Sequence, residues 1–322
     1  MRLARSAALA ALMLGGQAFA FGGGIAGDLR LVAPSAPGSS WDLLAQALGA
    51  AIGERAGGAS VAVVNAPGAG GTVGLSQFAG STSNDDLLVT GLTMLDAAIV
   101  GRTPVTLDRL TPIARLVSEP YVLVVPANSP FRNLDDLRAA LAAGTPKMNW
   151  GGGPVGGVDH VGTLLFLKAL GLDAGRVNYV PFLTSTEAGA AALEERVHVA
   201  FLSAGEILPG LAEGKLVPLG VAAPTRLPEI PVGTLAEAGI ALSYGNWRGI
   251  LARSGLSDAD RMRLESLVSA AVSSGSWRRF MAKRGWREAY LGGEAFGSLI
   301  RDDQIRVKEA LKAAGIIRRP TD

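Results

Sequence analysis

Residues 61–74 read Val-Ala-Val-Val-Asn-Ala-Pro-Gly-Ala-Gly-Gly-Thr-Val-Gly, and this stretch contains the unit that decides the fold. Its first part, Val61–Asn65, is a short run of mostly β-branched residues, which is typical of a buried strand. The glycines that follow predict a tight turn with positive φ, and the turn opens a helix. A strand, a glycine-rich loop and a helix in this order form the repeating unit of α/β proteins with parallel strands.

The same alternation continues along the chain and indicates α/β architecture with a mostly parallel sheet. Short apolar runs predict strands, and 3.6-residue periodicity predicts helices. The predicted strands are Leu29–Ala33, Val61–Asn65, Leu87–Thr90, Tyr121–Pro126, Met148–Trp150, Val177–Phe182, Val197–Ser203 and Val217–Ala223. The predicted helices are Leu43–Ile52, Leu134–Ala142, Val161–Leu170, Glu187–Glu195, Ala259–Ser273 and Phe296–Ala314.

Composition limits the kinds of site that the chain can build. The chain has 322 residues, of which 48% are hydrophobic, and at roughly 150 residues per domain this predicts two domains. It has no cysteine, which excludes disulfide scaffolds, thiolate zinc sites and thiol nucleophiles. Only two histidines, His160 and His198, are available for metal or acid–base chemistry. We therefore expect function to depend mainly on glycines, hydroxyl groups and the backbone, with no cofactor and no metal.

The first twenty residues have the features of a secretory signal peptide. Arg2 and Arg5 precede the apolar run 7–14, and Ala18-Phe19-Ala20 is a small-residue cleavage site. The apolar run is too short for a membrane anchor, which needs about 20 residues. We expect residues 1–20 to be removed and the mature protein to be soluble in the periplasm of a Gram-negative bacterium.

Loss of the leader also changes the charge. Removing two arginines lowers Lys plus Arg from 30 to 28, which equals the 28 acidic residues. A formally neutral mature chain argues against binding to nucleic acid or to a membrane surface.

Two domain divisions are compatible with the order of elements. A sequential division would cut the chain once, near residues 126–130, and would leave few strands after residue 250. A discontinuous division gives one domain of residues 21–125 plus 224–322 and a second domain of residues 126–223. We prefer the discontinuous division, because it gives both domains strands and helices, and because two crossings make a hinge that suits closure on a ligand. The Pro- and Gly-rich stretch 218–233 is expected to be a linker.

Loops that follow strands and open helices are the candidate binding elements. Their backbone N–H groups and the helix dipoles favour anions, and in an α/β sheet such loops meet at the carboxyl ends of the strands. The first candidate loop covers residues 34–42 and includes the hydroxyls of Ser39 and Ser40 and the indole of Trp41. The second covers residues 65–74, where Thr72 stands in place of the lysine that a phosphate-binding P-loop requires. This substitution argues against nucleotide phosphate binding.

A third loop, residues 149–160, contains Gly-x-Gly-x-x-Gly from Gly151 to Gly156. This motif between a strand and a helix is also found in dinucleotide enzymes. The next strand, however, ends in residues 181–184 without an acidic residue to bind a ribose hydroxyl. An exported protein also has little access to NAD. We therefore do not expect a nucleotide cofactor.

A fourth group combines residues 203–206 with residues 90–93 of the other domain, and residues 246–249 add the cation of Arg248. Arg248 is suited either to a ligand carboxylate or to an ordinary salt bridge. Asp159 and His160 are sequence neighbours, and their side chains point in different directions at a helix start, so they do not form a dyad by themselves. The sequence therefore favours anion binding over catalysis.

The stretches 33–42, 64–74, 150–160 and 246–249 together resemble the substrate-binding proteins of tripartite tricarboxylate transporters, the Bug/TctC family. The resemblance covers essentially the whole mature chain. It implies a type II periplasmic binding protein fold, in which two doubly wound α/β domains, joined by a two-strand hinge, close a cleft on an organic anion. It also implies delivery of that anion to a permease with one large and one small integral subunit. One departure is Ser39-Ser40, where the family usually has glycines, which narrows the loop and adds hydroxyl donors.

The resemblance implies that the ligand-facing residues lie in these loops. They are Pro37, Gly38, Ser39, Ser40, Trp41, Asp42, Gly70, Gly71, Thr72, Thr90, Thr93, Gly152, Gly153, Gly156, Gly157, Asp159, His160, Phe182, Thr184, Ser203, Gly205 and Trp247. The hypothesis is a monomeric, non-enzymatic carrier of a di- or tricarboxylate, with a citrate-like ligand. Two alternatives remain open: an exported enzyme that uses Asp159 and His160 on a small acid, and a ligand-sensing subunit that signals through a membrane partner.

Overall fold

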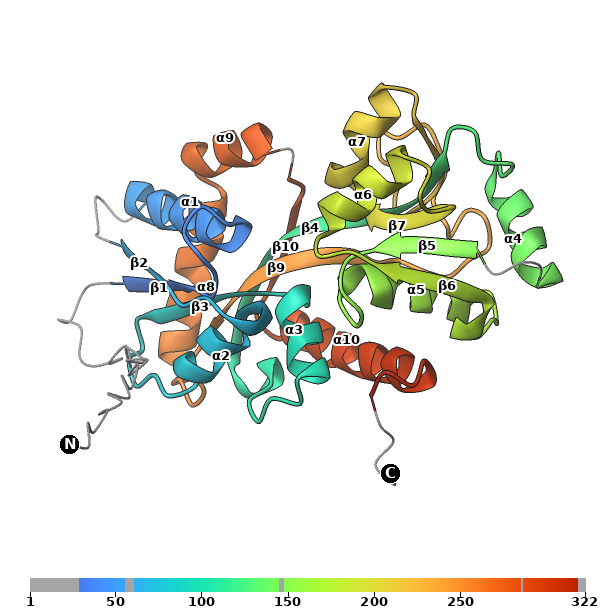
Figure 1. The fold of residues 1–322 in the computed structure, drawn as a ribbon. Helices are drawn as coiled ribbons and strands as arrows, with labels where there is room; N and C mark the ends of the chain where they lie inside the picture. The colour runs from blue at the N-terminus through green and yellow to red at the C-terminus, as the bar shows by residue number, and fades with distance from the viewer. Residues whose placement is uncertain (1–28, 56–60, 145–147, 285, 318–322) are drawn as a thin grey trace, which may run out of the picture.

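The computed structural model describes residues 29–55, 61–144, 148–284 and 286–317. The predicted signal peptide, residues 1–20, lies outside this part of the chain. In the described residues, helices and strands alternate in the order expected for an α/β protein (Figure 1), which confirms the predicted fold class.

The first sheet is built from both ends of the chain. Strands β1 (Leu29–Ala33), β2 (Val61–Asn65) and β3 (Asp86–Gly91) are parallel and are followed by helices α1 (Ser40–Arg55), α2 (Thr72–Phe78) and α3 (Leu92–Val100). The short 3₁₀ helices η1 (Ala69–Gly71) and η2 (Leu107–Arg109) lie in the connecting loops. The C-terminal part adds β9 (Gly245–Ala252), β10 (Glu288–Gly292), α8 (Asp258–Val272), α9 (Gly275–Arg284) and α10 (Gly293–Ala313).

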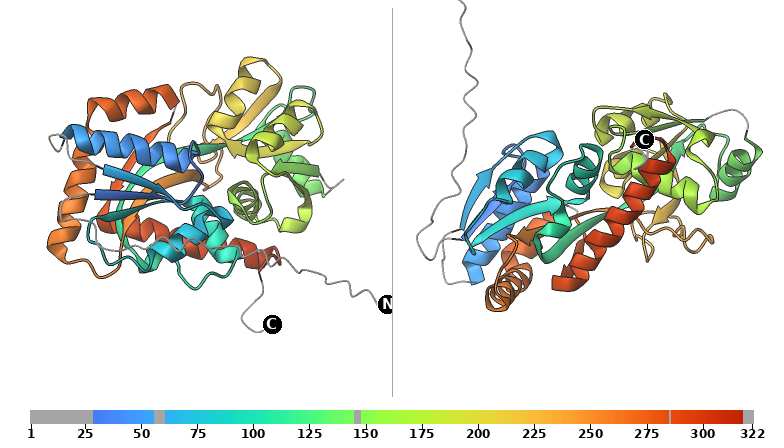
Figure 2. Two further views of the ribbon diagram at one scale, coloured as in Figure 1. Left: turned by 60° about the vertical axis from the view of Figure 1, so that its left-hand side comes forward. Right: turned by 90° about the horizontal axis from the view of Figure 1, so that it is seen from below.

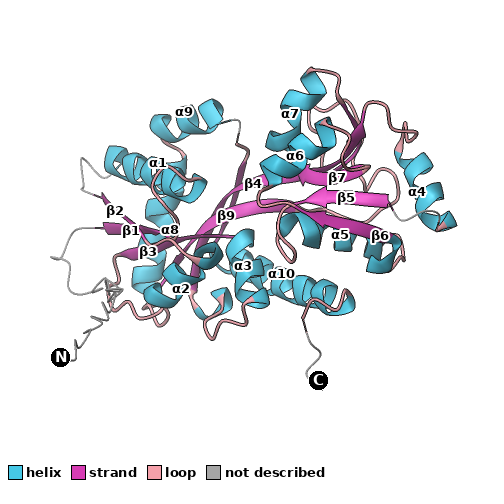
Figure 3. Ribbon diagram, viewed as in Figure 1, coloured by secondary structure: helices cyan, strands magenta, loops and turns pink. Residues whose placement is uncertain are grey.

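The second sheet is built from the middle of the chain. It contains β5 (Met148–Gly152), β6 (Val177–Pro181), β7 (Val199–Ser203) and β8 (Leu216–Ala222). Helices α4 (Leu134–Ala143), α5 (Val158–Ala169), α6 (Ser185–Leu193) and α7 (Ala204–Ala212), with the 3₁₀ helix η3 (Ala174–Arg176), connect and cover these strands. Figure 3 shows the strands of both sheets between layers of helices.

One long strand, β4 (Thr111–Pro126), belongs to both sheets. Its residues 111–120 pair with β9 in the first sheet, and its residues 121–126 pair with β7 and β8 in the second. The chain returns at Tyr244, whose carbonyl accepts from the amide of Tyr121 at 3.1 Å. The strand order β2-β1-β3-β9-β4-β7-β5-β6 therefore runs through both halves without a break. Figure 1 shows β4 and β9 side by side between the two halves.

Helix α10 also contacts both halves of the molecule. It packs on β4 and α3 and extends to α5, where Lys168 and Glu309 form an ion pair at 2.9 Å. Its Asp303 is buried, accepts from the indole nitrogen of Trp247 at 2.6 Å and pairs with Arg306 at 2.7 Å. Figure 2 shows this helix on the side of the molecule that is lowest in Figure 1, and its right-hand view shows the helix extending from one half to the other.

All eight predicted strands and all six predicted helices are present, with ends that shift by a few residues. Strands β9 and β10, residues 111–120 of β4 and helices α3 and α9 were not predicted, whereas α2 and α7 were expected without bounds, as helices that follow the loops at residues 65–74 and 203–206. The linker prediction for residues 218–233 is wrong at its start, because Pro218 to Ala222 belong to β8 and pair with β4. The domain boundaries at 125/126 and 223/224 stay a prediction. None of the described helices has the length and apolar character needed to span a bilayer.

The glycine turn of residues 68–71 packs against the side chain of Trp41. Gly71 has φ +92°, and a Cβ atom there would lie 2.6 Å from Cζ3 of Trp41, which is buried in the core. The turn after β2 thus needs glycine both for its backbone conformation and for the space that Trp41 takes.

We expect Gly71→Ala to destabilise the fold. Gly239 is the matched control, because it has φ +77° and open space around its Cα. Gly239→Ala should lower the free energy of unfolding by about 1 kcal/mol through backbone strain. Gly71→Ala should cost a further 1–3 kcal/mol, roughly, through overpacking. Urea unfolding of both variants measures the difference, and equal losses would contradict the close contact with Trp41.

Candidate functional site

Two cavities lie between the first and second sheets. Cavity A, of about 350 Å³, is lined by Ser40, Glu119 and Arg248 from the first half and by residues 203–206 from the second. Cavity B, of about 420 Å³, is lined by Gly70 and Thr93 from the first half and by residues 153–159 from the second. Both cavities therefore receive loops from the two sides of the molecule.

The two cavities share one face of the central strands. Glu119 is opposite Asn246 in the antiparallel register of β4 and β9, and Arg248 lies two residues further along β9. Because alternate residues of a strand point to the same face, Asn246 in cavity B and Arg248 in cavity A lie on one face of β9. Trp247, between them, points to the opposite face and donates to Asp303 of α10. The cavities are thus consecutive along the strand pair.

Asp159 fixes the loop that walls cavity B. Its Oδ2 accepts from the amide of Gly153 at 2.7 Å, and its Oδ1 accepts from the hydroxyl of Tyr121 at 2.6 Å. Burial raises the pKa of Asp159, although the hydrogen bonds from Tyr121, Ser185 and Gly153 partly oppose this. The carboxyl group therefore ties the loop to β4.

His160 and Tyr179 hold the same loop from the other side. Nδ1 of His160 accepts from the amide of Gly156 at 3.1 Å, and its ring stacks on Tyr179 with 3.9 Å between centroids. The hydroxyl of Tyr179 donates to the carbonyl of Gly153 at 2.9 Å. Burial lowers the pKa of His160 to about 4, so the ring is neutral at pH 7. Asp159 and His160 thus both bond to the backbone of the loop, which is not the geometry of an acid–base pair.

The glycine amides of this loop are used within the loop itself. Gly153 donates to Asp159, Gly156 to His160, and Gly157 to the carbonyl of Pro154 at 2.9 Å. The glycines therefore shape the cavity wall. Because their amides are already paired, hydrogen bonds to an anion in the cavity would have to come from other groups.

Helix N-termini provide those donors. Helices α3, α5 and α7 follow Gly91, Gly157 and Ser203, and none of these three N-cap residues makes a side-chain cap. Helices α4 and α8, by contrast, are capped by Asn133 and Ser257. The first-turn residues of α3 and α5 line cavity B, and those of α7 line cavity A. Uncapped N–H groups with the positive end of a helix dipole form an anion-binding arrangement.

The first loop is held by Asp42. Its carboxylate accepts from the amide of Gly38 at 2.8 Å and from the side-chain nitrogen of Asn65 at 2.9 Å. Burial alone would raise the pKa of Asp42, but the hydrogen bonds from Gly38, Asn65 and Gln46 outweigh it and lower the pKa. Ser39 donates its hydroxyl to Ser35, so only Ser40 of the serine pair lines a cavity.

The sequence-predicted residues fall into three groups in the structure. Those that line cavity A are Ser40, Ser203 and Gly205. Those that line cavity B are Gly70, Thr93, Gly153, Gly156, Gly157 and Asp159. The others lie behind these surfaces or away from them, and they are Pro37, Gly38, Ser39, Trp41, Asp42, Gly71, Thr72, Thr90, Gly152, His160, Phe182, Thr184 and Trp247. Thr184 caps α6 by accepting from the amide of Glu187. Which of these residues contact a ligand stays a prediction.

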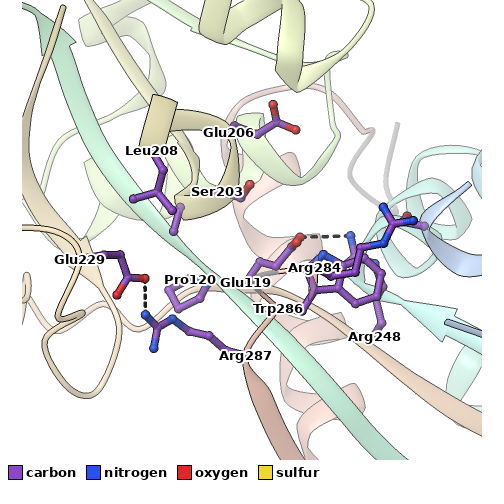
Figure 4. A pocket seen from close by; sticks show the side chains of 13 residues that line it. Glu119, Pro120, Ser203, Glu206, Leu208, Glu229, Arg248, Arg284, Trp286 and Arg287 are labelled. Carbon is purple, nitrogen blue, oxygen red and sulfur yellow. Dashed lines mark hydrogen bonds and ion pairs between the residues drawn. The ribbon is translucent and has the colours of Figure 1, made fainter. Parts of the chain in front are cut away.

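Sequence reasoning missed several residues of cavity A (Figure 4). Glu119 comes from β4, and Trp286 and Arg287 come from the segment before β10. Arg287 pairs with Glu229 from the connection between β8 and β9, and Arg248 pairs with Glu119. The sequence signals for this cavity were Ser40, residues 203–206 and the motif containing Arg248, whereas the ion-pair partner Glu119 is distant in the chain from Arg248.

One family model and several known proteins match this chain. The sequence model of the tripartite tricarboxylate transporter family receptor matches residues 47–316. A UPF0065 protein of Bordetella pertussis is 27% identical over 254 residues, which cover 76% of each chain. BugT from the same organism is 24% identical over 304 residues, which cover 90% of this chain and 88% of BugT.

Solved structures agree with this result. The crystal structure of a TctC solute-binding protein from Polaromonas has a TM-score of 0.80 and 26% identity, over 88% of this chain and 97% of that one. MatC from Rhodopseudomonas palustris with bound malate has a TM-score of 0.65 and 24% identity, over 88% and 99% of the chains. A second R. palustris protein, with adipate, has a TM-score of 0.66 and 23% identity, over 89% and 97%. The predicted periplasmic binding protein fold is therefore confirmed.

We expect Tyr121→Phe to destabilise the protein by about 1–3 kcal/mol, because it removes a buried hydrogen bond to Asp159. Tyr290→Phe, at an exposed position, is the control and should change stability little. Urea unfolding at pH 7 measures both. A loss no larger than that of the control would show that the Tyr121 hydroxyl does not support the loop.

We also expect His160 to make stability pH-dependent. Its folded pKa of about 4 lies below the unfolded value near 6.5, so the unfolded chain binds the proton first as the pH falls. Its stabilising contribution is complete above pH 6.5 and is lost toward pH 4, by up to about 3 kcal/mol. His160→Asn should flatten the difference between unfolding free energies at pH 7 and pH 4.5. An unchanged slope in His160→Asn would contradict the neutral buried ring.

Proposed function

The chain belongs to the tripartite tricarboxylate transporter family of receptors, and from this premise we propose that it is a periplasmic carrier of a small di- or tricarboxylate. A citrate-like acid is the proposed ligand. The proposed partner is a membrane permease of one large and one small integral subunit, to which the carrier delivers the acid. Its solved relatives bind malate and adipate, which are both dicarboxylates.

The observation that carries the proposal is the set of uncapped helix N-termini at the two cavities. Helices α3, α5 and α7 begin there without a side-chain cap, so their first-turn N–H groups remain for a ligand. Several charge-assisted hydrogen bonds from such N–H groups stabilise a carboxylate without a dedicated cation. Ser40 and Ser203 add hydroxyl donors in cavity A.

Closure around the ligand is part of the proposal. Residues 21–125 plus 224–322 would form one domain and residues 126–223 the other, with the hinge on the strands that cross between the sheets. Rotation about β4 near Pro120 and about the returning chain near Tyr244 would bring the cavity walls together. Such closure buries the ligand in a monomer.

Export is proposed from the sequence of residues 1–20, which has the charged start, apolar run and cleavage site of a signal peptide. Carriers of this family are periplasmic binding proteins, and the leader would send the chain to that compartment.

A thermal-shift series on the mature chain from Phe21 tests the function. Citrate, malate, succinate and adipate are the ligands, and NAD and ATP are the controls. A ligand that binds only the folded state raises the midpoint with concentration over Kd. A saturable shift with one or more acids is expected. No shift with any acid, or a shift with NAD alone, would overturn the carrier.

We expect Gly153→Ala to weaken binding of the acid found in that series by about tenfold or more. A Cβ atom there would lie 3.2 Å from Asp159 Oδ2 and 3.6 Å from Ser185 Oγ, so it fits the fold with little movement but occupies the wall of cavity B. Gly189→Ala on α6 is the control, since its Cβ meets only ordinary contacts at 3.8 Å. Isothermal titration of both variants measures the change. Wild-type affinity in Gly153→Ala would remove cavity B from the site.

A further inference from the structure

Arg248 presents a buried donor that no described residue uses. Arg248 is 7% exposed and lies on β9 at the wall of cavity A. Its Nη2 donates to Glu119 at 3.1 Å, whereas its Nη1 is buried without a hydrogen-bond partner in the described part of the chain. A guanidinium stays charged at any physiological pH, and a buried donor left unpaired is costly. Nη1 of Arg248 therefore remains a buried donor without an acceptor in the described part of the chain.

The guanidinium is held in place before any ligand arrives. Its Cζ lies 4.7 Å from the ring centroid of Trp286, in a cation–π contact. Glu119 is its diagonal neighbour across the β4–β9 pair. The Arg248 Cγ lies 3.5 Å from the position of a Cβ at Gly91, so the glycine at the end of β3 leaves room for the side chain. A guanidinium whose position is already fixed loses little conformational entropy when it binds a carboxylate.

Cavity A adds further features that favour an anion beside Arg248. The N-termini of α1, at Ser40, and of α7, at Ser203, both line it, and the hydroxyl of Ser203 is not used as a cap. Figure 4 shows Ser203 and Glu206 on one side of the cavity and Arg248 with Trp286 on another. Helix N-termini from both halves of the molecule thus add their positive ends to the guanidinium.

The remaining charges limit how much negative charge the cavity accepts. Arg287 is paired with Glu229, and Arg248 is paired with Glu119. Glu206 lies on the first turn of α7 without a cationic partner among the described residues, and Arg284 provides an exposed cation at the rim. This distribution of charges favours one ligand carboxylate at Nη1 of Arg248. A second carboxylate in cavity A would be repelled by the negative charge of Glu119 or Glu206.

We propose that Arg248 determines specificity for acids with at least two carboxylates. Its free Nη1 binds one carboxylate in cavity A, while the uncapped N-terminus of α5 binds the other in cavity B. The two cavities are consecutive along one face of β9, from Arg248 to Asn246, so a single extended acid reaches both. This inference rests on the proposed carboxylate-carrier function. Glu119 and Trp286 act through Arg248 as positioning residues.

The test compares acids that differ by one carboxylate. Isothermal titration of the mature chain uses adipate with hexanoate and malate with 3-hydroxybutyrate. Wild type is expected to prefer the acid with the extra carboxylate by about 10- to 100-fold in at least one pair, as a charge-assisted hydrogen bond supplies. Arg248→Met should bind both acids of that pair equally, with the affinity of wild type for the poorer acid.

Two further variants separate specificity from folding and from general charge. Arg248→Met leaves Glu119 without its partner, so the double variant Arg248→Met with Glu119→Gln removes both charges together and should show the same loss of preference. Arg287→Met removes a positive charge from the same cavity but leaves Nη1 of Arg248 in place. It is expected to keep the wild-type preference.

The outcomes distinguish this inference from the function on which it rests. If wild type binds carboxylic acids and either Arg248 variant keeps the same preference, the role of Arg248 is wrong while the carrier function stands. The same holds if wild type does not prefer the acid with the extra carboxylate, or if Arg287→Met loses the preference equally. If wild type binds none of the acids, both proposals fail.

Discussion

The hydrogen bonding of strand β4 is the constraint on which both halves of the molecule depend. Up to Pro120 the strand completes the first sheet, and from Tyr121 onward it completes the second. Because one strand serves both, the residues on either side of this change have fixed positions relative to both sheets. Glu119 then meets Arg248 at one cavity, and Tyr121 meets Asp159 at the other. The candidate site is thus a direct product of the strand that joins the sheets.

Polar side chains in this protein mostly position the backbone. Asp42, Asp159 and His160 each accept from a loop amide, and their pKa values differ in direction because their surroundings differ. Hydrogen bonds outweigh burial at Asp42, whereas burial dominates at Asp159 and His160. Asp42, Asp159 and His160 thus shape loops, and in the proposed carrier the helix N-termini and Arg248 contact the ligand.

Sequence reasoning found the fold because most elements have local signals. The strand–loop–helix units and the glycine loops depend on periodicity and on residues close in the chain. Strand β9 was missed because Asn246 and Arg248 interrupt its apolar pattern, and the helix expected after residues 203–206 received no bounds because Pro209 lies inside it. Cavity A was largely missed because its members meet only through tertiary structure, as when Glu119 meets Arg248, 129 residues later. The glycine motif of residues 151–157 was found, but the internal use of its amides depends on Asp159 and His160, whose orientation no local pattern predicts.

The position of β9 between β3 and β4 has a consequence for biosynthesis. During synthesis β3 leaves the ribosome early, whereas β9 follows only after the whole second sheet has been made. Until then the edge of β3 that β9 will cover is open, and open strand edges pair readily with other chains. The first sheet cannot form completely before β9 has been synthesised, because β9 lies between β3 and β4. In the proposed exported protein, such a delay would favour crossing of the membrane in the unfolded state, while the open edge of β3 would be a site for aggregation.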